Sequence, residues 1–242
     1  MSQIVRQPRM ILSTQGLTSA GKTYFALKDT PRPALLLDFD YGAEGLPEDV
    51  LEGVDIAQYD LLAGTFKGES DARREQIIRE ETERFLADYR AAIDQAKYRL
   101  IVVDTASVLW SGLRLRYDKN YAAAEEVMHS LIRAAYKSTT NLTLIHHMTT
   151  VWARNKDGKS YKNHGVYERT GMEGVDNKVQ LAIEQRWVEP IMGPDGSVVA
   201  AGRFEARILK CRDNKPLEGV MIEAPDWQTL CTMAAPSVDW SK

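Results

Sequence analysis

The sequence contains little that would place it in a membrane, in an oxidising compartment or at a structural zinc site. Only two cysteines, Cys211 and Cys231, occur among the 242 residues, and neither has a neighbour at metal-ligand spacing. No run of about 18 apolar residues is present, and the first residues, MSQIVRQPRM, lack the apolar core of a signal peptide. We therefore expect a cytoplasmic protein with reduced thiols and no membrane association.

An excess of basic residues is also missing. The net charge is −3, so the whole-chain field does not attract nucleic acid, and any such contact must come from a local patch. Hydrophobic residues make up 44% of the chain and charged residues 27%, which is ordinary for a globular protein with a buried core. The length suits one large α/β domain or two small ones.

What the sequence does contain is a phosphate-loop pattern. The octet GLTSAGKT, residues 16–23, fits G-x-x-x-x-G-K-[ST] at every constrained position. Lys22 would reach the β- and γ-phosphates of a nucleotide, and the Thr23 hydroxyl would ligate Mg²⁺. The alternative is a chance glycine-rich turn, which the apolar strand before the octet and the helix after it disfavour. The expected nucleotide contacts are Gly16, Leu17, Thr18, Ser19, Ala20, Gly21, Lys22, Thr23 and Tyr24.

Buried apolar runs alternate with helical periodicity along the chain. The expected strands cover residues 9–13, 34–40, 100–103 and 141–148. Helices are expected from Lys22 to no further than Lys28, over 70–97, around Val127 to Ala135, and over 175–183. Residues 42–68 are expected to be irregular, and residues 184–212 to form antiparallel strands around a turn at 193–196.

This order of elements predicts one α/β domain over residues 1–242. We expect a largely parallel central sheet flanked by helices, followed by a C-terminal antiparallel hairpin.

Acidic residues follow two of the expected strands. Asp104 ends the run LIVVD, at the sheet edge where open α/β folds bind ligands, and there it can hold the Mg²⁺ that bridges the phosphates. Asp38, Asp40 and Glu44 follow the earlier run ALLL, and Asp40 is our candidate for the base that activates the attacking water. Alternatively, these acids terminate strands and face water.

A histidine pair ends the next expected strand. His147 can sense the γ-phosphate and relay its presence to the following segment, although a purely structural role for the pair His146 and His147 is equally open. A zinc site is disfavoured, because no cysteine or second histidine motif lies nearby.

The segment 149–171 has few aliphatic residues and many basic and aromatic ones. Basic side chains can follow a phosphate backbone while aromatic rings stack on unpaired bases, so this segment is a candidate loop for binding single-stranded DNA. The alternative is a mobile, solvated lid. The candidate contacts are Trp152, Arg154, Lys156, Lys159, Tyr161, Lys162 and Arg169.

Two further cations occur late in the chain. Lys210 and Arg212 are two residues apart on an expected strand and therefore share one face. They can meet a phosphate, either their own or that of a neighbouring subunit, in the manner of an arginine finger. The alternative is a solvated strand face.

Taken in order, GLTSAGKT, LLLDFD, LIVVDTASVLW, LTLIHHM and RILKCR resemble the core of RecA-like recombinase ATPases. The similarity covers about residues 9–212 and is closest to the small phage-encoded RecA-like ATPases of single-strand annealing and recombination. It implies that Asp40 is the catalytic carboxylate and Asp104 the Walker B residue. Because the family usually has Glu at the first position, either Asp40 or Glu44 can position the water. His147 stands where the family usually has Gln.

The resemblance also implies a first DNA-binding loop near residues 110–121, with Arg114, Arg116 and Lys119, and trans phosphate contacts from Lys210 and Arg212. It implies a Mg²⁺-dependent ATPase, stimulated by single-stranded DNA, that acts in phage recombination or replication in the host cytoplasm. A homo-oligomer, either filament or ring, and a phage single-strand-binding protein are the implied partners. Two alternatives stay open: a nucleotide-dependent switch acting on a protein partner, and a helicase-type motor of the same fold.

Overall fold

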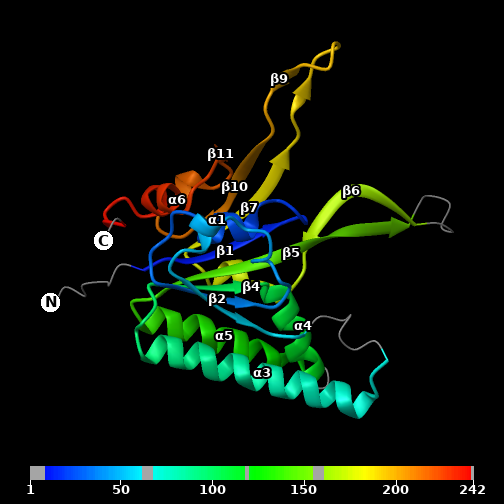
Figure 1. Cartoon of the computed structure of the whole chain (residues 1–242), viewed down its shortest axis with the longest axis vertical. Coiled ribbons are helices and arrows are strands. Elements are labelled where there is room, and N and C mark those ends of the chain that lie inside the picture. Colours follow the sequence, from blue (N-terminus) through cyan, green and yellow to red (C-terminus); the bar gives the residue numbers. More distant parts are fainter. Residues whose placement is uncertain (1–8, 62–67, 118–119, 155–160, 241–242) are drawn as a thin grey trace.

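The computed structural model describes residues 9–61, 68–117, 120–154 and 161–240, the backbone alone being described at 152–154 and 161–166. Within these residues, nine strands form one sheet (Figure 1), and eight of them follow the order β11-β10-β7-β1-β5-β4-β2-β3, while β6 pairs with β5. The strands from β7 to β3 in this order are parallel, and β10 and β11 are antiparallel. This confirms the α/β class with its antiparallel C-terminal part.

The parallel strands are β1 (Ile11–Gly16), β2 (Ala34–Asp38), β3 (Val54–Gln58), β4 (Leu100–Asp104), the start of β5 (Asn141–Arg154) and β7 (Leu181–Val188). Of the parallel strands, β1, β2 and β4 are entirely buried at the centre of the sheet, whereas β3 is a largely exposed edge strand. Continuous apolar runs such as Leu100–Val103 form the buried strands because both sheet faces are covered by helices. The carboxyl ends of these parallel strands, including Gly16 of β1 and Asp38 of β2, therefore lie at the same end of the sheet.

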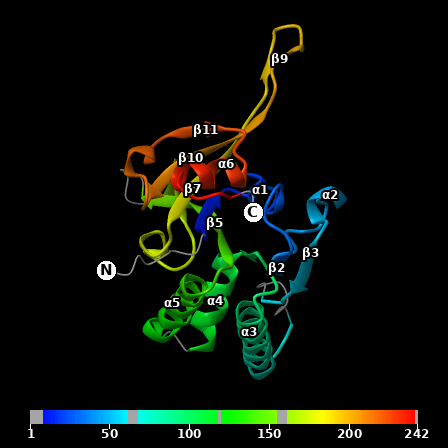
Figure 2. The same cartoon turned by 90° about the vertical axis from the view of Figure 1, so that its left-hand side faces the viewer.

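Helices cover the two faces unequally (Figure 2). Helices α3 (Asp71–Asp94), α4 (Ala106–Arg116) and α5 (Tyr121–Lys137) pack on one face and bury the largest apolar cluster. Helices α1 (Lys22–Leu27) and α6 (Trp227–Ala234) pack on the other face, and the short helix α2 (Glu48–Leu51) lies beside α1. Among the described helices, none combines the length and the apolarity that crossing a membrane requires.

The first βα unit follows the sequence expectation. Strand β1 ends at Gly16, the phosphate-loop octet connects it to α1, and α1 ends at Leu27 before the prolines that follow. Because β1 lies between β5 and β7, the phosphate loop follows a central strand of the sheet and not an edge strand. The predicted helix over 70–97 is also confirmed as α3, whose first turn is capped by Ser70 accepting the N–H of Arg73.

Two expectations are wrong. Residues 42–68 are not wholly irregular, because α2 and the edge strand β3 form there. No residue of β3 is fully buried, with Val54 and Ala57 half-buried and the others exposed, so the strand has no continuous apolar run to detect. Residues 175–183 are not a helix: a single 3₁₀ turn at Val175–Asn177 leads directly into β7. Pairing of β7 with β1 and β10 overrides its local helical pattern.

The segments expected to be DNA-binding loops also differ from the expectation. Residues 149–171 are not an open loop, since β5 continues to Arg154 and pairs with β6 (Tyr161–Arg169) in an antiparallel hairpin that extends beyond the sheet (Figure 1). Its tip, with Lys156 and Lys159, lies outside the described residues. Residues 110–121 form the end of α4 and the start of α5, leaving only a short connection in which Lys119 lies outside the described residues.

A second hairpin also leaves the body. Beyond Val188, β7 continues through β8 (Ile191–Met192), a turn at Gly193–Gly196 and β9 (Val198–Ala200), then returns as β10 (Arg203–Cys211), which pairs with β11 (Met221–Glu223). This turn and the antiparallel pairing of β7 with β10 confirm the expectation for residues 184–212. At its base the Trp187 ring packs against Phe204, 4.8 Å between centroids. We call residues 188–202 the arm.

Candidate active site

The phosphate loop occupies the edge of the sheet where the parallel strands end. Its nine expected nucleotide contacts, residues 16–24, form one continuous turn from β1 into α1, with residues 17–19 exposed to solvent. Gly21 has φ +75°, and a Cβ there would lie 2.7 Å from the Phe204 ring. Only glycine fits this position, so the backbone N–H groups of the loop keep the open curvature that surrounds a phosphate.

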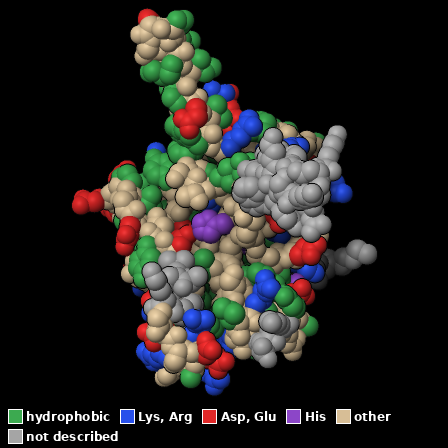
Figure 3. Space-filling view, turned by 90° about the vertical axis from the view of Figure 1, so that its right-hand side faces the viewer, with side chains coloured by type: hydrophobic (Ala, Val, Ile, Leu, Met, Phe, Trp, Pro, Cys, Tyr) green, Lys and Arg blue, Asp and Glu red, His purple; other side chains and the backbone are tan. Residues whose placement is uncertain are grey.

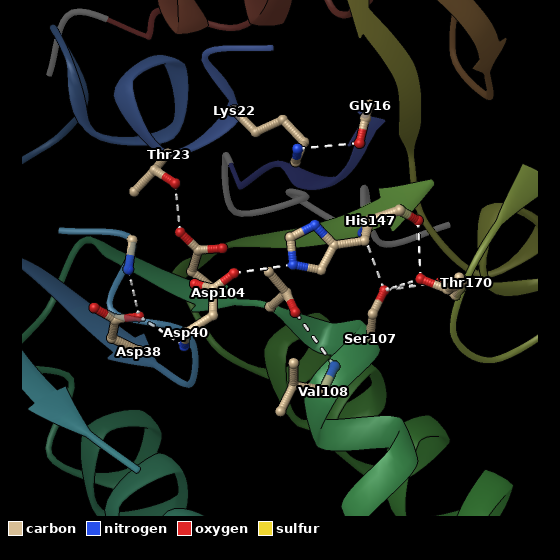
Figure 4. A network of polar contacts seen from close by, with 12 residues as sticks. Gly16, Lys22, Thr23, Asp38, Asp40, Asp104, Ser107, Val108, His147 and Thr170 are labelled. Atoms are coloured by element: carbon tan, nitrogen blue, oxygen red, sulfur yellow. Dashed lines mark hydrogen bonds and ion pairs between the residues drawn. The ribbon is translucent and has the colours of Figure 1, made fainter. Parts of the chain in front are cut away.

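Lys22 is drawn into the loop. Its Nζ donates to the carbonyl oxygens of Gly16, at 3.0 Å, and Leu17, at 2.7 Å (Figure 4). Burial lowers the pKa of the ammonium below its usual value, while Asp104 and Asp40 partly offset that effect. The positive charge is therefore held by carbonyl oxygens and nearby carboxylates at the place where phosphate would bind.

Thr23 and Asp104 meet across the site. The Thr23 hydroxyl donates to Asp104 Oδ2 at 2.6 Å, although the two residues are 81 positions apart in sequence. Burial, together with the charge of Asp40, raises the pKa of Asp104 to about 7, whereas the Thr23 hydrogen bond acts in the opposite direction. The two residues that the sequence predicts as Mg²⁺ ligands are thus in direct contact.

Gly42 keeps a space open beside these oxygens. A Cβ at this position would lie 2.5 Å from Asp104 Oδ2, 3.1 Å from Thr23 Oγ1 and 3.2 Å from Asp40 Oδ1. Among the described residues, no group of three or more His, Cys, Asp or Glu side chains is arranged to hold a metal alone. Oxygen donors around one open point fit Mg²⁺, which takes few protein ligands and completes its shell with phosphates and water.

Asp40 and His147 face each other in the same site. His147 Nε2 lies 2.9 Å from Asp40 Oδ2, whereas Asp40 Oδ1 is buried without a hydrogen-bond partner. Asp38, one of the acids considered in the sequence, has a structural role instead, because its carboxylate accepts N–H groups from Asp40, Gly42 and Ala43. Asp38 thereby shapes the turn that carries Asp40.

A network of hydrogen bonds extends from His147 to the base of the β5–β6 hairpin (Figure 4). The His147 N–H donates to Ser107 Oγ at 3.0 Å, and the Ser107 hydroxyl donates to the Thr170 carbonyl at 2.9 Å. The Thr170 N–H donates back to the His147 carbonyl at 2.9 Å. The segment after β6 is therefore fastened to the same strand residue that contacts Asp40.

The neighbouring histidine has no part in this contact. Successive residues of a strand point to opposite faces, so His146 turns away from Asp40 and is fully buried, with neither ring nitrogen hydrogen-bonded. Burial, together with the charge of Arg169, lowers the pKa of His146 to about 3. Its ring is neutral at physiological pH.

Several predicted site residues lie elsewhere. Glu44 is exposed on the turn after Asp40, and none of the contacts between described site residues includes its carboxylate. Arg114 donates to the Tyr121 hydroxyl at 2.7 Å, and Arg116 donates to Glu83 at 3.0 Å. These two arginines bind neighbouring helices instead of projecting from a loop.

Of the candidate DNA contacts in the hairpin, only Arg169 has a described side chain. Its guanidinium donates to Asp176 Oδ1 at 2.6 Å and to the Met172 carbonyl at 3.1 Å, and is mostly buried. Arg169 is thus a clamp at the hairpin base and is not free to follow a phosphate backbone. Nothing is described of the side chains of Trp152, Arg154, Tyr161 and Lys162.

Lys210 and Arg212 lie near the amino-terminal ends of the parallel strands, at the end of the sheet opposite the phosphate loop. Strand β10 is antiparallel to β7, so Lys210 stands level with Ala182, which pairs with Ser13 near the start of β1. The Lys210 ammonium donates to Asn177 at 2.9 Å, and the Arg212 guanidinium donates to the Tyr136 hydroxyl at 3.1 Å. Neither cation can reach a phosphate held by its own loop.

Four residues that shape the site have no signal in the sequence motifs. Gly42, Ser107, Thr170 and Phe204 act through space or backbone contacts, and none belongs to a motif with a fixed spacing. Ser107 was the most accessible to prediction, because it comes three residues after Asp104 and so lies near the end of the LIVVD strand.

The raised pKa of Asp104 predicts a pH-dependent stability in the absence of nucleotide and metal. Its carboxyl is protonated in the folded state up to about pH 7 but ionises at about pH 3.8 when unfolded, so this contribution is lost as pH rises between those values. Hence the Asp104→Asn variant should gain up to about 4 kcal/mol over the wild type across that window, at about 1.4 kcal/mol per pKa unit. Urea unfolding at several pH values measures the difference.

His146 acts in the opposite direction but cancels in the comparison. Its lowered pKa adds stability above about pH 6.5, which is lost as pH falls towards 3, in the variant and the wild type alike. A difference between the two proteins that stays constant from pH 4 to pH 8 would contradict the assignment of the buried proton to Asp104.

Comparison with known proteins identifies the family. A family model described as an AAA domain matches residues 9–183, more than two thirds of the chain. The chain belongs to the AAA domain family. This AAA domain contains the phosphate loop, Asp40, Asp104 and His147, and it is a nucleotide-binding domain of the P-loop ATPase type. No curated protein matches the chain.

Proposed function

We propose that this protein is a RecA-like, Mg²⁺-dependent ATPase that acts on single-stranded DNA during phage recombination or replication, in the host cytoplasm. The observation that carries the proposal is the continuity of β5. One strand contains His147, which contacts Asp40 in the nucleotide site, and then continues into the basic hairpin of residues 149–171. A change at the γ-phosphate therefore has a direct mechanical route to the segment suited to bind DNA.

Each residue of the site has a role in hydrolysis that its position supports. The loop N–H groups and Lys22 bind the phosphates, Lys22 exchanging its two carbonyl partners for phosphate oxygens. Asp40 orients the attacking water and accepts its proton, and its partner His147 holds the carboxylate in place. Mg²⁺, held by Thr23 and Asp104, would neutralise charge on the phosphates when bound.

The hairpin suits single-stranded DNA by its composition. Residues 149–171 contain the cations Arg154, Lys156, Lys159 and Lys162 together with Trp152 and Tyr161, in a chain whose net charge is negative. Because Arg114, Arg116 and Arg169 bind other parts of the chain, the remaining cations of the hairpin are the ones expected to contact DNA.

Lys210 and Arg212 support an oligomer. Both lie at the sheet edge opposite the phosphate loop, so a phosphate contact from either requires a second copy stacked head-to-tail, in a filament or ring. In that arrangement they would act on the neighbour's nucleotide as trans cations. Residues 1–242 then act as one motor domain, with a phage single-strand-binding protein as a further partner.

The test is ATP turnover with and without single-stranded DNA. We expect tight binding of DNA in the presence of nucleotide and a turnover that rises when DNA is added. DNA that neither binds nor stimulates turnover would exclude the recombination role while leaving the ATPase assignment intact.

One observation favours a second candidate, a nucleotide-dependent switch that acts on a protein partner. The arm carries four exposed aliphatic side chains, which is more typical of a protein contact than of a DNA contact: Ile191, Met192, Val198 and Val199. Slow turnover unaffected by DNA, with a protein ligand that binds only the ATP state, would favour the switch. A helicase-type motor would instead unwind duplex DNA in the same turnover assay.

The hairpin lysines give a quantitative test of the DNA path. The double substitution Lys159→Ala with Lys162→Ala should reduce the slope of log affinity against log salt by about 1.4, since each phosphate contact on a single strand contributes about 0.7. Fluorescence anisotropy of a labelled oligonucleotide at several salt concentrations measures it. The matched control replaces two exposed lysines outside the hairpin, Lys137→Ala with Lys215→Ala, and should keep the slope. A slope equal to that of the wild type would remove the hairpin from the DNA path.

A further inference from the structure

The arm exposes more aliphatic surface than a lone hairpin needs. Ile191, Met192, Val198 and Val199 are 54–68% exposed, on both strands, and the arm stands clear of the body in Figure 1 and Figure 3. A two-stranded hairpin is marginally stable in water by itself, and contiguous exposed apolar side chains on a soluble protein mark an interaction surface. At its base, the Trp187 ring lies over Gly202, where a Cβ would clash, so the arm begins from a fixed point.

Two adjoining hollows lie near the amino-terminal ends of the parallel strands, at the end of the sheet opposite the phosphate loop. The larger has a volume of about 710 Å³, with Arg9, Tyr136 and Arg212 on one side and the segment after α6 on the other. The last residue of α6, Ala234, and the segment after it supply an apolar wall, completed by Ala235, Pro236, Val238 and Trp240. The smaller, about 270 Å³, shares Tyr136 and Arg212 with it and adds Ile132, Arg133 and Lys178. We call the two together the tail hollow.

Charge distinguishes the two surfaces. The arm, residues 188–202, contains the acids Glu189 and Asp195 and no Lys or Arg. The tail hollow is lined by four cations, Arg9, Arg133, Lys178 and Arg212, of which Arg133 pairs with Glu126, and by the acid Asp213. An apolar, acidic projection and a basic hollow with one apolar wall therefore occur on the same chain.

Their positions exclude a contact within one copy and favour a head-to-tail one. The arm leaves where β7 ends, at the edge with the phosphate loop, whereas Gln180 and Arg9 of the tail hollow directly precede β7 and β1. Because the complementary surfaces are different patches on opposite edges, pairing between copies is heterologous, which produces rings or open filaments rather than a closed dimer.

We propose that the arm of one copy docks into the tail hollow of the next. This deepens the proposed function, on which it rests, by naming the surfaces that join the subunits. Ile191, Met192, Val198 and Val199 enter against the apolar wall, and Glu189 lies towards Arg9. The same contact brings the edge that carries Lys210 of one copy towards the phosphate-loop edge of another.

The primary experiment is sedimentation velocity of the full chain with a non-hydrolysable ATP analogue and no DNA. Wild type should assemble with rising protein concentration, and Ile191→Asp with Val199→Asp should weaken that association at least tenfold while still binding the analogue. The matched control adds two aspartates at exposed aliphatic positions elsewhere, Leu115→Asp with Ile56→Asp, and should assemble as wild type does. Assembly of the arm variant at wild-type strength, or a wild type that stays monomeric, overturns the proposal.

Charge exchange tests the partner of the arm. Glu189→Arg alone and Arg9→Glu alone should each weaken assembly, and the protein carrying both should recover most of it. Recovery supports the pairing of the arm with the tail hollow, whereas losses that simply add overturn it. The double variant also answers the objection that either single change disturbs folding.

A turnover measurement keeps this inference separate from the proposed trans contact. Lys210 lies outside the tail hollow, so the Lys210→Ala variant should assemble normally. It should nevertheless lose ATP turnover if the Lys210 ammonium reaches the neighbour's phosphate. Normal assembly with normal turnover would remove the trans cation and leave the arm contact standing. If the arm variant loses assembly but still binds nucleotide without DNA, the result supports the contact between the arm and the tail hollow, whatever the role of DNA.

Discussion

In the Asp40→Asn variant, ATP turnover is expected to fall by about a hundredfold or more, because a positioned general base contributes roughly 10²–10⁴ to the rate. Asparagine keeps the shape of the side chain and a hydrogen bond to His147 but cannot accept the proton of the attacking water. Single-turnover hydrolysis of radiolabelled ATP measures the chemical step, and binding of a fluorescent analogue shows that the site still fills.

Glu44→Gln is the matched control for that substitution. The two acids lie four residues apart, and the family resemblance leaves either one able to position the water. The structure brings Asp40 to His147 and leaves Glu44 exposed, so Glu44→Gln should keep turnover within about twofold. If Glu44→Gln loses as much activity as Asp40→Asn, the assignment of the base is wrong.

Gly42→Ala is expected to weaken Mg²⁺-dependent nucleotide binding by about 10- to 100-fold, the range found when groups around metal ligands are disturbed. The added methyl would lie 2.5 Å from Asp104 Oδ2, closer than a carbon and an oxygen can pack, so it would fill the space between Asp104 and Thr23. Titration of Mg²⁺ against a fluorescent ATP analogue measures the effect, and the affinity without Mg²⁺ should change much less.

Gly193→Ala provides the control for crowding by a methyl group. Its Cβ would lie 2.9 Å from two side-chain oxygens, those of Asp195 and Ser197, but in the arm, far from the nucleotide loop. This variant should bind Mg²⁺ and nucleotide as wild type does. Equal loss in both variants, or a Gly42→Ala protein with an unchanged Mg²⁺ titration, would show that the space beside Gly42 has no role in the site.

The nucleotide loop and its strands were predictable from sequence because their signals are local. The octet 16–23 has fixed spacing, and the apolar runs before it and at Leu100–Val103 are continuous since both sheet faces are covered. The end of α1 was predictable for the same kind of reason, as prolines follow it within six residues. Such features depend on neighbours in the chain.

The elements that failed prediction depend on distant partners. Residues 149–171 lack an apolar run, yet they form a hairpin because β5 continues past the sheet and β6 pairs back onto it. Residues 175–183 have helical periodicity, but β7 has strand neighbours on both sides, and two ladders of hydrogen bonds outweigh a local preference. Neither outcome can be derived from a short window of sequence.

The features of the site also separate into those set by local sequence and those set by contacts between distant residues. By itself, the sequence determined that a phosphate loop follows the first strand, that acids end two other strands, and that a histidine pair lies in a fourth. Parallel strands have their carboxyl ends on the same side of a sheet, so these residues were expected to lie close together. Only the tertiary structure decided that Asp40 rather than Glu44 faces His147, that Gly42 leaves room beside Asp104, and that Lys210 lies at the opposite edge. Those are distances between residues far apart in the chain, and packing and strand register set them.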